Sequence, residues 1–293
     1  MSSARLVAQA KINLRLRVLA KEATGYHSIE TIFLRLDLGD DVRVRVAPGR
    51  TLDCAGPAMP ASGLGPTEKN IAYRAAVAYQ DATGWPSGFA IEIGKRIPVG
   101  GGLGGGSADA GAVLRALDEL APNPLAERLP ELAASLGADV PFMTIDSPMA
   151  LAWGRGERLL PLHPVESRAV LLVIPGFPVS TADAYGWLSS DRGTYQPVAS
   201  VLRPDLVATW ESLHTIAVND FETVVARRHP VIAKLIDELD AAGAALAMMS
   251  GSGSTVFGVF ADPPDAARLA RTTGLTVTET RTSERVVRVE VDG

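Results

Sequence analysis

The chain has 293 residues, of which 47% are hydrophobic and 21% charged, a balance typical of globular domains with a large core. Its formal net charge of −5 argues against the basic face of a nucleic-acid-binding protein. No apolar run approaches the length of a membrane span, and the single cysteine, Cys54, excludes an internal disulfide. We therefore expect a cytoplasmic protein, monomeric or weakly dimeric, whose partners are small molecules, with no nucleic acid or membrane among them.

The first predicted strand, residues 6–19, carries a polar pair. Apolar residues alternate from Ile12 to Val18, which is the pattern of a half-buried strand. Lys11 and Asn13 are two residues apart, so their side chains share one face of it. By count the chain has five lysines against 23 arginines, which makes Lys11 informative, although a solvated edge charge is the ordinary alternative.

A turn at Thr24-Gly25 is followed by Tyr26 and His27. In most loops an adjacent tyrosine and histidine serve only packing and surface. A tyrosine ring can also stack on a nucleobase, and an imidazole can bond the edge of one. The pair is therefore a candidate for base recognition only if other parts of the chain require it.

The next elements follow from alternation and composition. Strands are predicted over 29–36 and 41–47, and the Pro-, Gly- and Ala-rich residues 53–67 predict a loop. Residues 68–79 predict a helix that Thr67 could cap. Asn70 would stand in its first turn, where a local structural role is nearly as well supported as a contact with a ligand.

The segment Pro98–Ala110 contains six glycines between a predicted strand, 89–97, and a predicted helix, 107–120. Ser107 is the expected N-cap, and Asp109 falls in the first turn, where a carboxylate suits the helix dipole. Glycines at the start of a helix leave backbone amides uncovered. Such a turn is typical of a phosphate site.

Three interpretations compete for this loop. A P-loop requires Lys and Ser or Thr directly after the last glycine, whereas Gly105 is followed by Gly106 and Ser107. A dinucleotide fold requires an acidic residue at the end of a second strand, but Asp118 and Glu119 lie inside the predicted helix. A flexible turn without a ligand is disfavoured because so many glycines cost chain entropy without adding to a core.

Further along, Asp139 lies in Gly137–Phe142, after a short predicted helix over 129–136. An aspartate before Val-Pro is usually a turn or cap residue. None of the four histidines pairs with another histidine or with cysteine at the spacing of a metal site. The remaining patterns predict a hairpin near 153–159, a buried strand over 168–174, a helix from 219 to 242, two strands joined by a Ser/Gly turn within 246–257, and a strand over 286–291.

Together these motifs resemble the GHMP kinases, a family that includes galactokinase, homoserine kinase and mevalonate kinase. The doubled Gly-Gly-Gly resembles one branch, the 4-diphosphocytidyl-2-C-methyl-D-erythritol kinases, and the likeness runs over nearly the whole chain. The segments that carry it are Ala10–Leu14, Gly25–His27, Asn70–Ala76, Pro98–Ser107, Gly137–Phe142, Gly154–Glu157 and Leu246–Phe257.

The resemblance implies a two-domain α/β (α+β) GHMP kinase fold. An N-terminal, ribosomal-protein-S5-like domain would span residues 1–162 and a C-terminal, ferredoxin-like domain residues 163–293. The implied reaction moves the γ-phosphoryl group of ATP to the 2-hydroxyl of 4-diphosphocytidyl-2-C-methyl-D-erythritol, in the non-mevalonate isoprenoid pathway. ATP and Mg²⁺ are the implied cofactors.

The resemblance also implies roles for individual residues. Asp139 would be the catalytic carboxylate that accepts the hydroxyl proton, and Lys11 beside it would keep it ionised. The implied ATP-binding residues are Asn70, Pro98, Val99, Gly100, Gly101, Gly102, Leu103, Gly104, Gly105, Gly106, Ser107 and Ala108. The implied substrate-binding residues are Asn13, Tyr26, His27, Thr181 and Tyr185, with Tyr26 and Tyr185 stacking on the cytosine.

The chain departs from the family pattern at two positions. Ala108 stands where the family has a serine, which leaves Ser107 as the candidate hydroxyl for magnesium and no dedicated metal ligand. Gly111 stands where the family has an alanine and should weaken the helix. Two alternatives stay open: a GHMP kinase for another alcohol, such as homoserine or a mevalonate derivative, and a nucleotide-binding sensor without catalysis. The sensor is disfavoured because both Lys11 and Asp139 are present.

Overall fold

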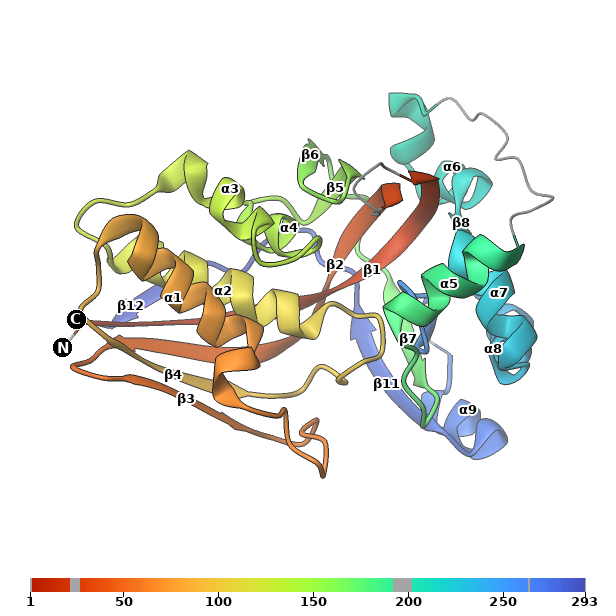
Figure 1. Cartoon of the computed structure of the whole chain (residues 1–293). Coiled ribbons are helices and arrows are strands. Elements are labelled where there is room, and N and C mark those ends of the chain that lie inside the picture. The colour runs from red at the N-terminus through yellow and green to blue at the C-terminus, as the bar shows by residue number, and fades with distance from the viewer. Residues whose placement is uncertain (1, 22–26, 192–201, 263, 293) are drawn as a thin grey trace.

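The computed structural model describes residues 2–21, 27–191, 202–262 and 264–292 (Figure 1). They form two sheets with helices packed on them. The helices are α1 Ile71–Thr83, α2 Gly105–Leu120, α3 Leu129–Ala134, α4 Val140–Thr144, α5 Thr181–Asp191, α6 Trp210–Ile216, α7 Asp220–Arg228, α8 Val231–Ala241 and α9 Ala266–Thr273. No helix among these described stretches is long and apolar enough to cross a membrane.

The first sheet is built on one long antiparallel hairpin, and its strands run in the order β12-β1-β2-β4-β3. Strand β5 pairs with β2 and β6, and β8 pairs with β1. These strands are β1 Ser3–Lys21, β2 His27–Val46, β3 Arg50–Ala55, β4 Phe89–Gly94, β5 Met149–Gly154, β6 Arg158–Leu162, β8 Val218–Asn219 and β12 Glu290–Asp292. Helices α1 and α2 cover one face of this sheet (Figure 1).

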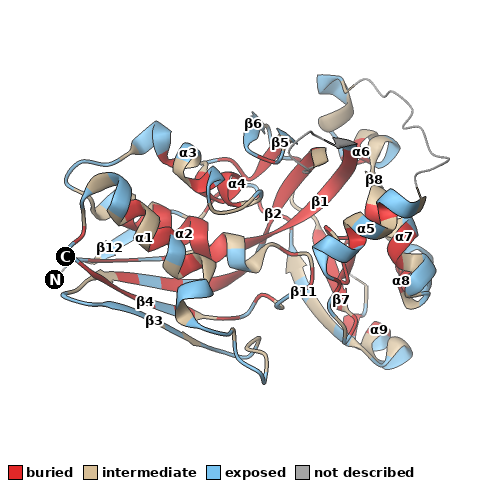
Figure 2. Ribbon diagram, in the orientation of Figure 1, coloured by how far each residue is buried: buried red, intermediate tan, exposed pale blue. Residues whose placement is uncertain are grey.

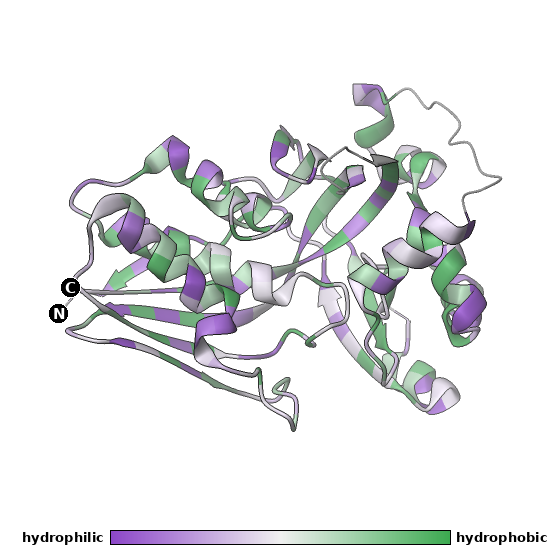
Figure 3. Ribbon diagram, in the orientation of Figure 1, coloured by the Kyte–Doolittle hydropathy of each residue, from purple (hydrophilic) through white to green (hydrophobic). Residues whose placement is uncertain are grey.

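Alternation along β1 produces the core of this layer. The even-numbered residues from Ala4 to Leu14 are buried and belong to one apolar cluster with the inner sides of α1 and α2. Apolar and polar residues alternate along much of β1 and along the last part of β2, and the sides of the helices that face the sheet are the buried ones (Figures 2 and 3). The predicted strand over 6–19 is therefore confirmed, with longer bounds.

The second sheet is antiparallel and runs in the order β11-β7-β10-β9. Its strands are β7 Ala169–Ile174, β9 Leu246–Met249, β10 Val256–Phe260 and β11 Thr276–Arg281. When the four strands are numbered by their order in the chain, their order in the sheet is 4-1-3-2. Helices precede β9 and β11, so this is the ferredoxin-like arrangement. The apolar run of β7 is buried on both faces, because Val170 and Leu172 join the first core cluster and Leu171 and Val173 join a second one with α7 and α8.

Several predicted boundaries are wrong. The strands predicted over 29–36 and 41–47 form the single strand β2. The alternation fails between them because the ladder with β1 shifts register there, between the pairs Gln9–Gly39 and Lys11–Arg35. The predicted loop from residue 53 begins inside strand β3, an edge strand in which half-buried Leu52 and Cys54 alternate with exposed residues. The predicted strand over 286–291 is shortened to β12, which pairs with β1 of the first sheet and brings the two chain ends together (Figure 1).

Two predicted helix starts also differ. Thr67–Lys69 form a 3₁₀ turn, and α1 begins only at Ile71, with the Asn70 side chain accepting the amide of Ala72 at 2.9 Å as the N-cap. Helix α2 begins at Gly105, two residues before the predicted start, and its N-cap is Gly104 in the left-handed region. Ser107 is therefore a first-turn residue and caps nothing. The domain division at residue 162 stays a prediction.

Candidate active site

A cavity of about 1620 Å³ lies between the glycine loop, the first strand, the start of α4 and the start of α5. It brings together almost every site residue predicted from the sequence. Ala108 is the exception, because its side chain is buried in the core below the loop. Tyr26 lies outside the described residues. The predicted residues that line the cavity are Lys11, Asn13, His27, Asn70, Pro98 to Ser107, Asp139, Thr181 and Tyr185.

Lys11 lies at the centre of this cavity as a buried cation. Its Nζ is 2.7 Å from Asn13 Oδ1 and 3.4 Å from Asp139 Oδ2. The Lys11 side chain is 4% exposed and that of Asp139 28%, so the carboxylate is the partner open to a substrate. Asp139 precedes α4 without capping it by its side chain. Lys11 and Asp139 therefore lie side by side, as the resemblance implies.

Three carbonyls of the glycine loop are held by hydrogen bonds to neighbouring segments. Gly101 O accepts the amide of Thr255 at 3.2 Å, and Leu103 O accepts the amide of Lys11 at 3.0 Å. Gly102 O accepts both Lys11 Nζ and Ser250 Oγ, each at 3.0 Å. A trans peptide unit directs its N–H opposite to its C=O. The contacts of Gly101 O and Leu103 O with the backbone of Thr255 and Lys11 therefore leave the amides of Gly102 and Gly104 turned toward the cavity.

The start of α2 adds further donors. Gly105, Gly106 and Ser107 occupy its first turn, where amides have no intrahelical acceptor. Gly100, Gly102 and Gly104 have positive φ values of 76°, 80° and 71°, a conformation that L side chains rarely adopt. The loop is thus a row of inward-pointing amides at the positive end of a helix, which suits a polyphosphate.

The turn between β9 and β10 is the support of that loop. Ser250 and Thr255 bond to Gly102 and Gly101, and Asn219 Nδ2 in turn donates to Met249 O and Gly251 O at 2.7 and 2.8 Å. A Cβ on Gly102 would lie 2.1 Å from Ser250 O. This Ser/Gly turn within Leu246–Phe257, which we call the third motif, therefore supports the glycine loop from behind.

A buried charge cluster at the foot of the loop was missed from the sequence. Lys95 Nζ donates to Asp109 Oδ2 at 2.7 Å and also to Asp40 Oδ2. Asp40 Oδ1 accepts the amides of Arg96 at 2.5 Å and Ile97 at 2.8 Å, which holds the chain just before the glycines. The three side chains come from three separate segments. The only signal in the sequence was the scarcity of lysine.

The expectation for Asp109 is therefore wrong. It is the fifth residue of α2, buried, and bonded to Lys95 instead of standing in the first turn for the dipole. Its Oδ1 is buried and has no hydrogen-bond partner among the described residues. Burial raises the pKa of Asp109 to about 8; Lys95 opposes the rise and Asp40 adds to it. One cation thus faces two carboxylates, and Asp40 also accepts the two backbone amides.

Replacing Asp109 by asparagine should therefore change how stability depends on pH. The folded-state pKa lies above the unfolded value, so wild-type stability declines as pH rises from about 4 to about 8. Asparagine does not titrate and can keep an acceptor toward Lys95. The melting temperature of Asp109→Asn relative to wild type should rise between pH 5 and pH 8, measured by circular dichroism. A difference that is constant over this range would contradict the assignment.

The far end of the cavity is aromatic. The rings of His27 and Tyr185 stack with centroids 5.0 Å apart and planes 15° apart, and Phe221 meets Tyr185 edge-on at 4.9 Å. Thr181 starts α5, and its hydroxyl lies 2.9 Å from Ser252 Oγ of the third motif. The imidazole of His27 covers one face of the Tyr185 ring. The sequence analysis expected the cytosine to stack on this ring.

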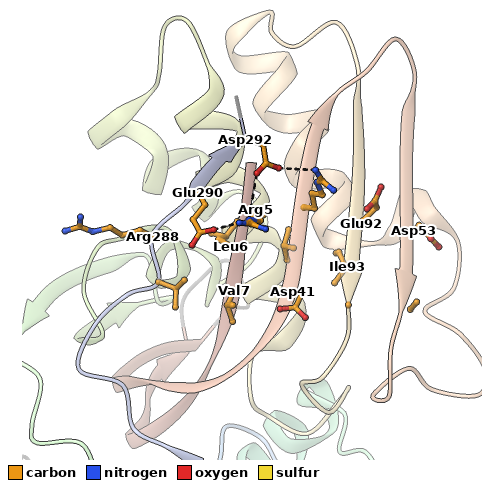
Figure 4. A pocket seen from close by; sticks show the side chains of 15 residues that line it. Arg5, Leu6, Val7, Asp41, Asp53, Glu92, Ile93, Arg288, Glu290 and Asp292 are labelled. Atoms are coloured by element: carbon orange, nitrogen blue, oxygen red, sulfur yellow. Dashed lines mark hydrogen bonds and ion pairs between the residues drawn. The ribbon is translucent and has the colours of Figure 1, made fainter. Parts of the chain in front are cut away.

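A second cavity of about 720 Å³ lies on the opposite, exposed side of the first sheet (Figure 4). Its charged groups pair with one another: Arg5 with Glu290 at 3.0 Å and Arg43 with Asp292 at 3.0 Å. No glycine loop or buried lysine borders it. The candidate active site is therefore the larger cavity.

Comparisons with known proteins agree with this assignment. The model of the GHMP kinases N terminal domain matches residues 70–147, and that of the GHMP kinases C terminal matches residues 198–272. The 4-diphosphocytidyl-2-C-methyl-D-erythritol kinase of Geobacter sp. (strain M21) is 43% identical over 273 residues, 92% of this chain and 94% of the relative. That of Deinococcus radiodurans is 38% identical over 261 residues, 88% and 85% of the two chains.

Solved structures give the same result. A crystal structure of 4-(cytidine 5'-diphospho)-2C-methyl-D-erythritol kinase matches with a TM-score of 0.77 and 33% identity, covering 95% of this chain and 99% of that one. A homoserine kinase from Cytophaga hutchinsonii matches with a TM-score of 0.70 but 18% identity, so it supports the fold alone. The chain is a GHMP kinase and belongs, within that family, to the 4-diphosphocytidyl-2-C-methyl-D-erythritol kinases.

Proposed function

We propose that the chain transfers the γ-phosphoryl group of ATP to the 2-hydroxyl of 4-diphosphocytidyl-2-C-methyl-D-erythritol, giving the 2-phosphate, in the non-mevalonate isoprenoid pathway. The observation that carries the proposal is the position of the Lys11–Asp139 pair. It lies between a loop of inward-pointing amides and an aromatic pair, all lining one cavity. A kinase that transfers a phosphoryl group from a polyphosphate to a nucleotide-bearing alcohol needs these three parts together.

The proposed mechanism follows from the geometry. The amides of the glycine loop and of the first turn of α2 hold the triphosphate. The Asp139 carboxylate accepts the proton of the alcohol, whose oxygen bonds to the γ-phosphorus as the bond to the bridging oxygen of ADP breaks. Lys11 orients the carboxylate and stabilises the negative charge that develops on the transferred group.

Magnesium fits this site as an ion held mainly by phosphate oxygens and water, as is usual for Mg²⁺. Among the described residues no group of three or more His, Cys, Asp or Glu side chains could hold a metal. The oxygen donors that line the cavity include the Ser107 hydroxyl and the Asp139 carboxylate, which are hard ligands of the right kind. When bound, the ion would neutralise phosphate charge. Ser107 is the proposed protein contact.

The experiment that tests the proposed function is a coupled assay of ADP release with a panel of alcohols. The cytidine diphosphate substrate should give a kcat/KM far above those of homoserine and mevalonate. Turnover of either smaller alcohol at a comparable kcat/KM would overturn the proposal in favour of another GHMP kinase activity. A cytoplasmic location and a monomeric or weakly dimeric state belong to the same proposal, supported by the single cysteine and the acidic net charge.

Removing the Tyr185 ring should raise KM for the cytidine substrate by about 10- to 100-fold, because stacking on a base is worth ~1–3 kcal/mol. Trp187→Ala is the matched control: it lies on the same helix but packs against Arg228 and His229 and does not line the cavity. Tyr26, outside the described residues, is proposed as the second stacking ring. An unchanged KM in both Tyr26→Ala and Tyr185→Ala would contradict base stacking.

The identity of the base should depend on His27. Stacking tolerates any base, whereas hydrogen bonds to the base edge reject a wrong one. Because the imidazole lies on Tyr185 without a ligand, we propose that it turns aside to meet the edge of the bound base. His27→Ala should therefore bring the KM values of the cytidine substrate and its uridine analogue closer together.

A further inference from the structure

Helix α4 carries the proposed base but is too short to hold its own position. It spans Val140–Thr144, five residues, and Asp139 immediately precedes it. A helix of little more than one turn is not stable alone, so its location depends on its neighbours. Two unusual residues contact it from two different elements: Arg35 of β2 and Gly111 of α2.

Arg35 holds the C-terminal end of α4. Its Nη2 donates to Phe142 O at 2.7 Å and to Ile145 O at 3.2 Å, and its Nε donates to Ser147 O at 3.3 Å. The guanidinium also lies 4.8 Å from the centre of the Phe142 ring. These carbonyls belong to the end of α4 and the residues just after it, where a cation is favoured by the helix dipole.

The burial of Arg35 in the core is energetically unfavourable. This arginine is 2% exposed, and among the described residues no carboxylate lies within 4.0 Å of its guanidinium. Burial, with Arg115 nearby, lowers the pKa of Arg35 to about 9, and the more distant Asp146 partly offsets this. Burying a cation without a paired carboxylate costs stability, so the contribution of Arg35 is to the geometry of the chain that it binds.

Gly111 allows α4 to approach α2 closely. A Cβ at this position would lie 2.4 Å from Met143 Cβ and 3.0 Å from Met143 O. Any larger residue would push α4 away from α2. This explains the departure from the alanine of the family pattern: the glycine weakens α2, but it lets α4 come closer.

The sheet links this contact to the catalytic pair. Lys11 and Arg35 are direct partners in the β1–β2 ladder, so their side chains leave the same face of the sheet. Lys11 reaches Asp139 before the first residue of α4, and Arg35 reaches the carbonyls at its last turn. The two ends of the short helix are therefore held by two neighbouring residues of the same sheet.

We infer that Arg35 and Gly111 are positioning residues, which clamp α4 so that the Asp139 carboxylate stands at its working distance from Lys11. The inference rests on the proposed role of Asp139. Neither residue lines the cavity, so neither touches a substrate. Both act on kcat through Asp139. The glycine loop keeps its affinity for ATP, because its carbonyls are held by Thr255, Ser250 and Lys11 and not by α4.

The test uses steady-state kinetics and ATP titration of Arg35→Met and Gly111→Ala in the full chain. Each should lower kcat by about 10- to 100-fold, since a displacement of about 1 Å costs that much, with the dissociation constant of ATP unchanged. Arg115→Met is the matched control, because that partly buried arginine donates to Val287 O at 2.7 Å and not to α4. It should retain the wild-type kcat.

A double-variant experiment separates positioning from general damage to the fold. In an Asp139→Asn background, Gly111→Ala and Arg35→Met should cause no further loss of kcat, because they act through the missing carboxylate. Equal further losses in both backgrounds would overturn the inference. So would a wild-type kcat in Gly111→Ala, which carries the test alone if Arg35→Met does not fold. Inactivity of the wild-type protein on the cytidine substrate would instead contradict the proposed function.

Discussion

Replacing Asp139 by asparagine is expected to lower kcat by ~10²–10⁴-fold, the contribution of a general base, while ATP still binds with nearly wild-type affinity. The amide has the shape of the carboxylate but cannot accept the proton. ATP affinity should survive because Lys11 keeps its bonds to Asn13 and to Gly102 O, which hold the glycine loop in place. The loop therefore does not depend on the carboxylate.

The measurement is kcat from ADP release together with calorimetric titration of ATP. Asp81→Asn is a suitable control, since that carboxylate is exposed on α1 and does not line the cavity. Turnover of Asp139→Asn within a few-fold of wild type would show that another group, or no group, removes the proton. A loss of ATP binding in this variant would show that the Lys11–Asp139 pair has a structural role in the loop.

Replacing Gly102 by valine is expected to abolish ATP binding in a protein that still folds. Considered from the sequence, a side chain here would block the phosphate itself. The structure gives a different reason, because the Cβ would collide with Ser250 O at 2.1 Å and approach Gly253 O at 3.3 Å. The loop would be driven off the third motif, and the carbonyl that Lys11 and Ser250 share would lose its place.

The control for backbone strain is Gly63→Val. Gly63 has a φ of 72°, close to the 80° of Gly102, but nothing lies within 4 Å of its Cβ position. The backbone is left-handed at both positions, so valine is equally unfavourable at each of them. The calorimetric signal for ATP should therefore disappear in Gly102→Val and persist in Gly63→Val, with both far-ultraviolet circular dichroism spectra like wild type. Unchanged ATP affinity in Gly102→Val would refute the phosphate-loop assignment.

The sequence was sufficient where the chemistry is local. Glycines between an alternating strand and an apolar-periodic helix predict a phosphate turn, because turn geometry and helix ends depend on neighbouring residues. The two-residue spacing of Lys11 and Asn13 predicts a shared face for the same reason, and their side chains do meet at 2.7 Å. The family resemblance then related Asp139 to Lys11, which lies 128 positions earlier in the chain and 3.4 Å away in space.

The tertiary structure alone decided which groups are brought together across the sheet. Lys95 meets Asp40 and Asp109, and Arg35 meets the end of α4, through contacts that no spacing in the sequence encodes. From the sequence alone, Gly111 only weakens helix α2. In the structure, the close approach of Met143 leaves no room for a side chain at this position. The sequence by itself therefore determined the reactive motifs and their local geometry. Their distances and supports depend on how β2, α2, α4 and the third motif pack together, because packing is a property of all these surfaces at once.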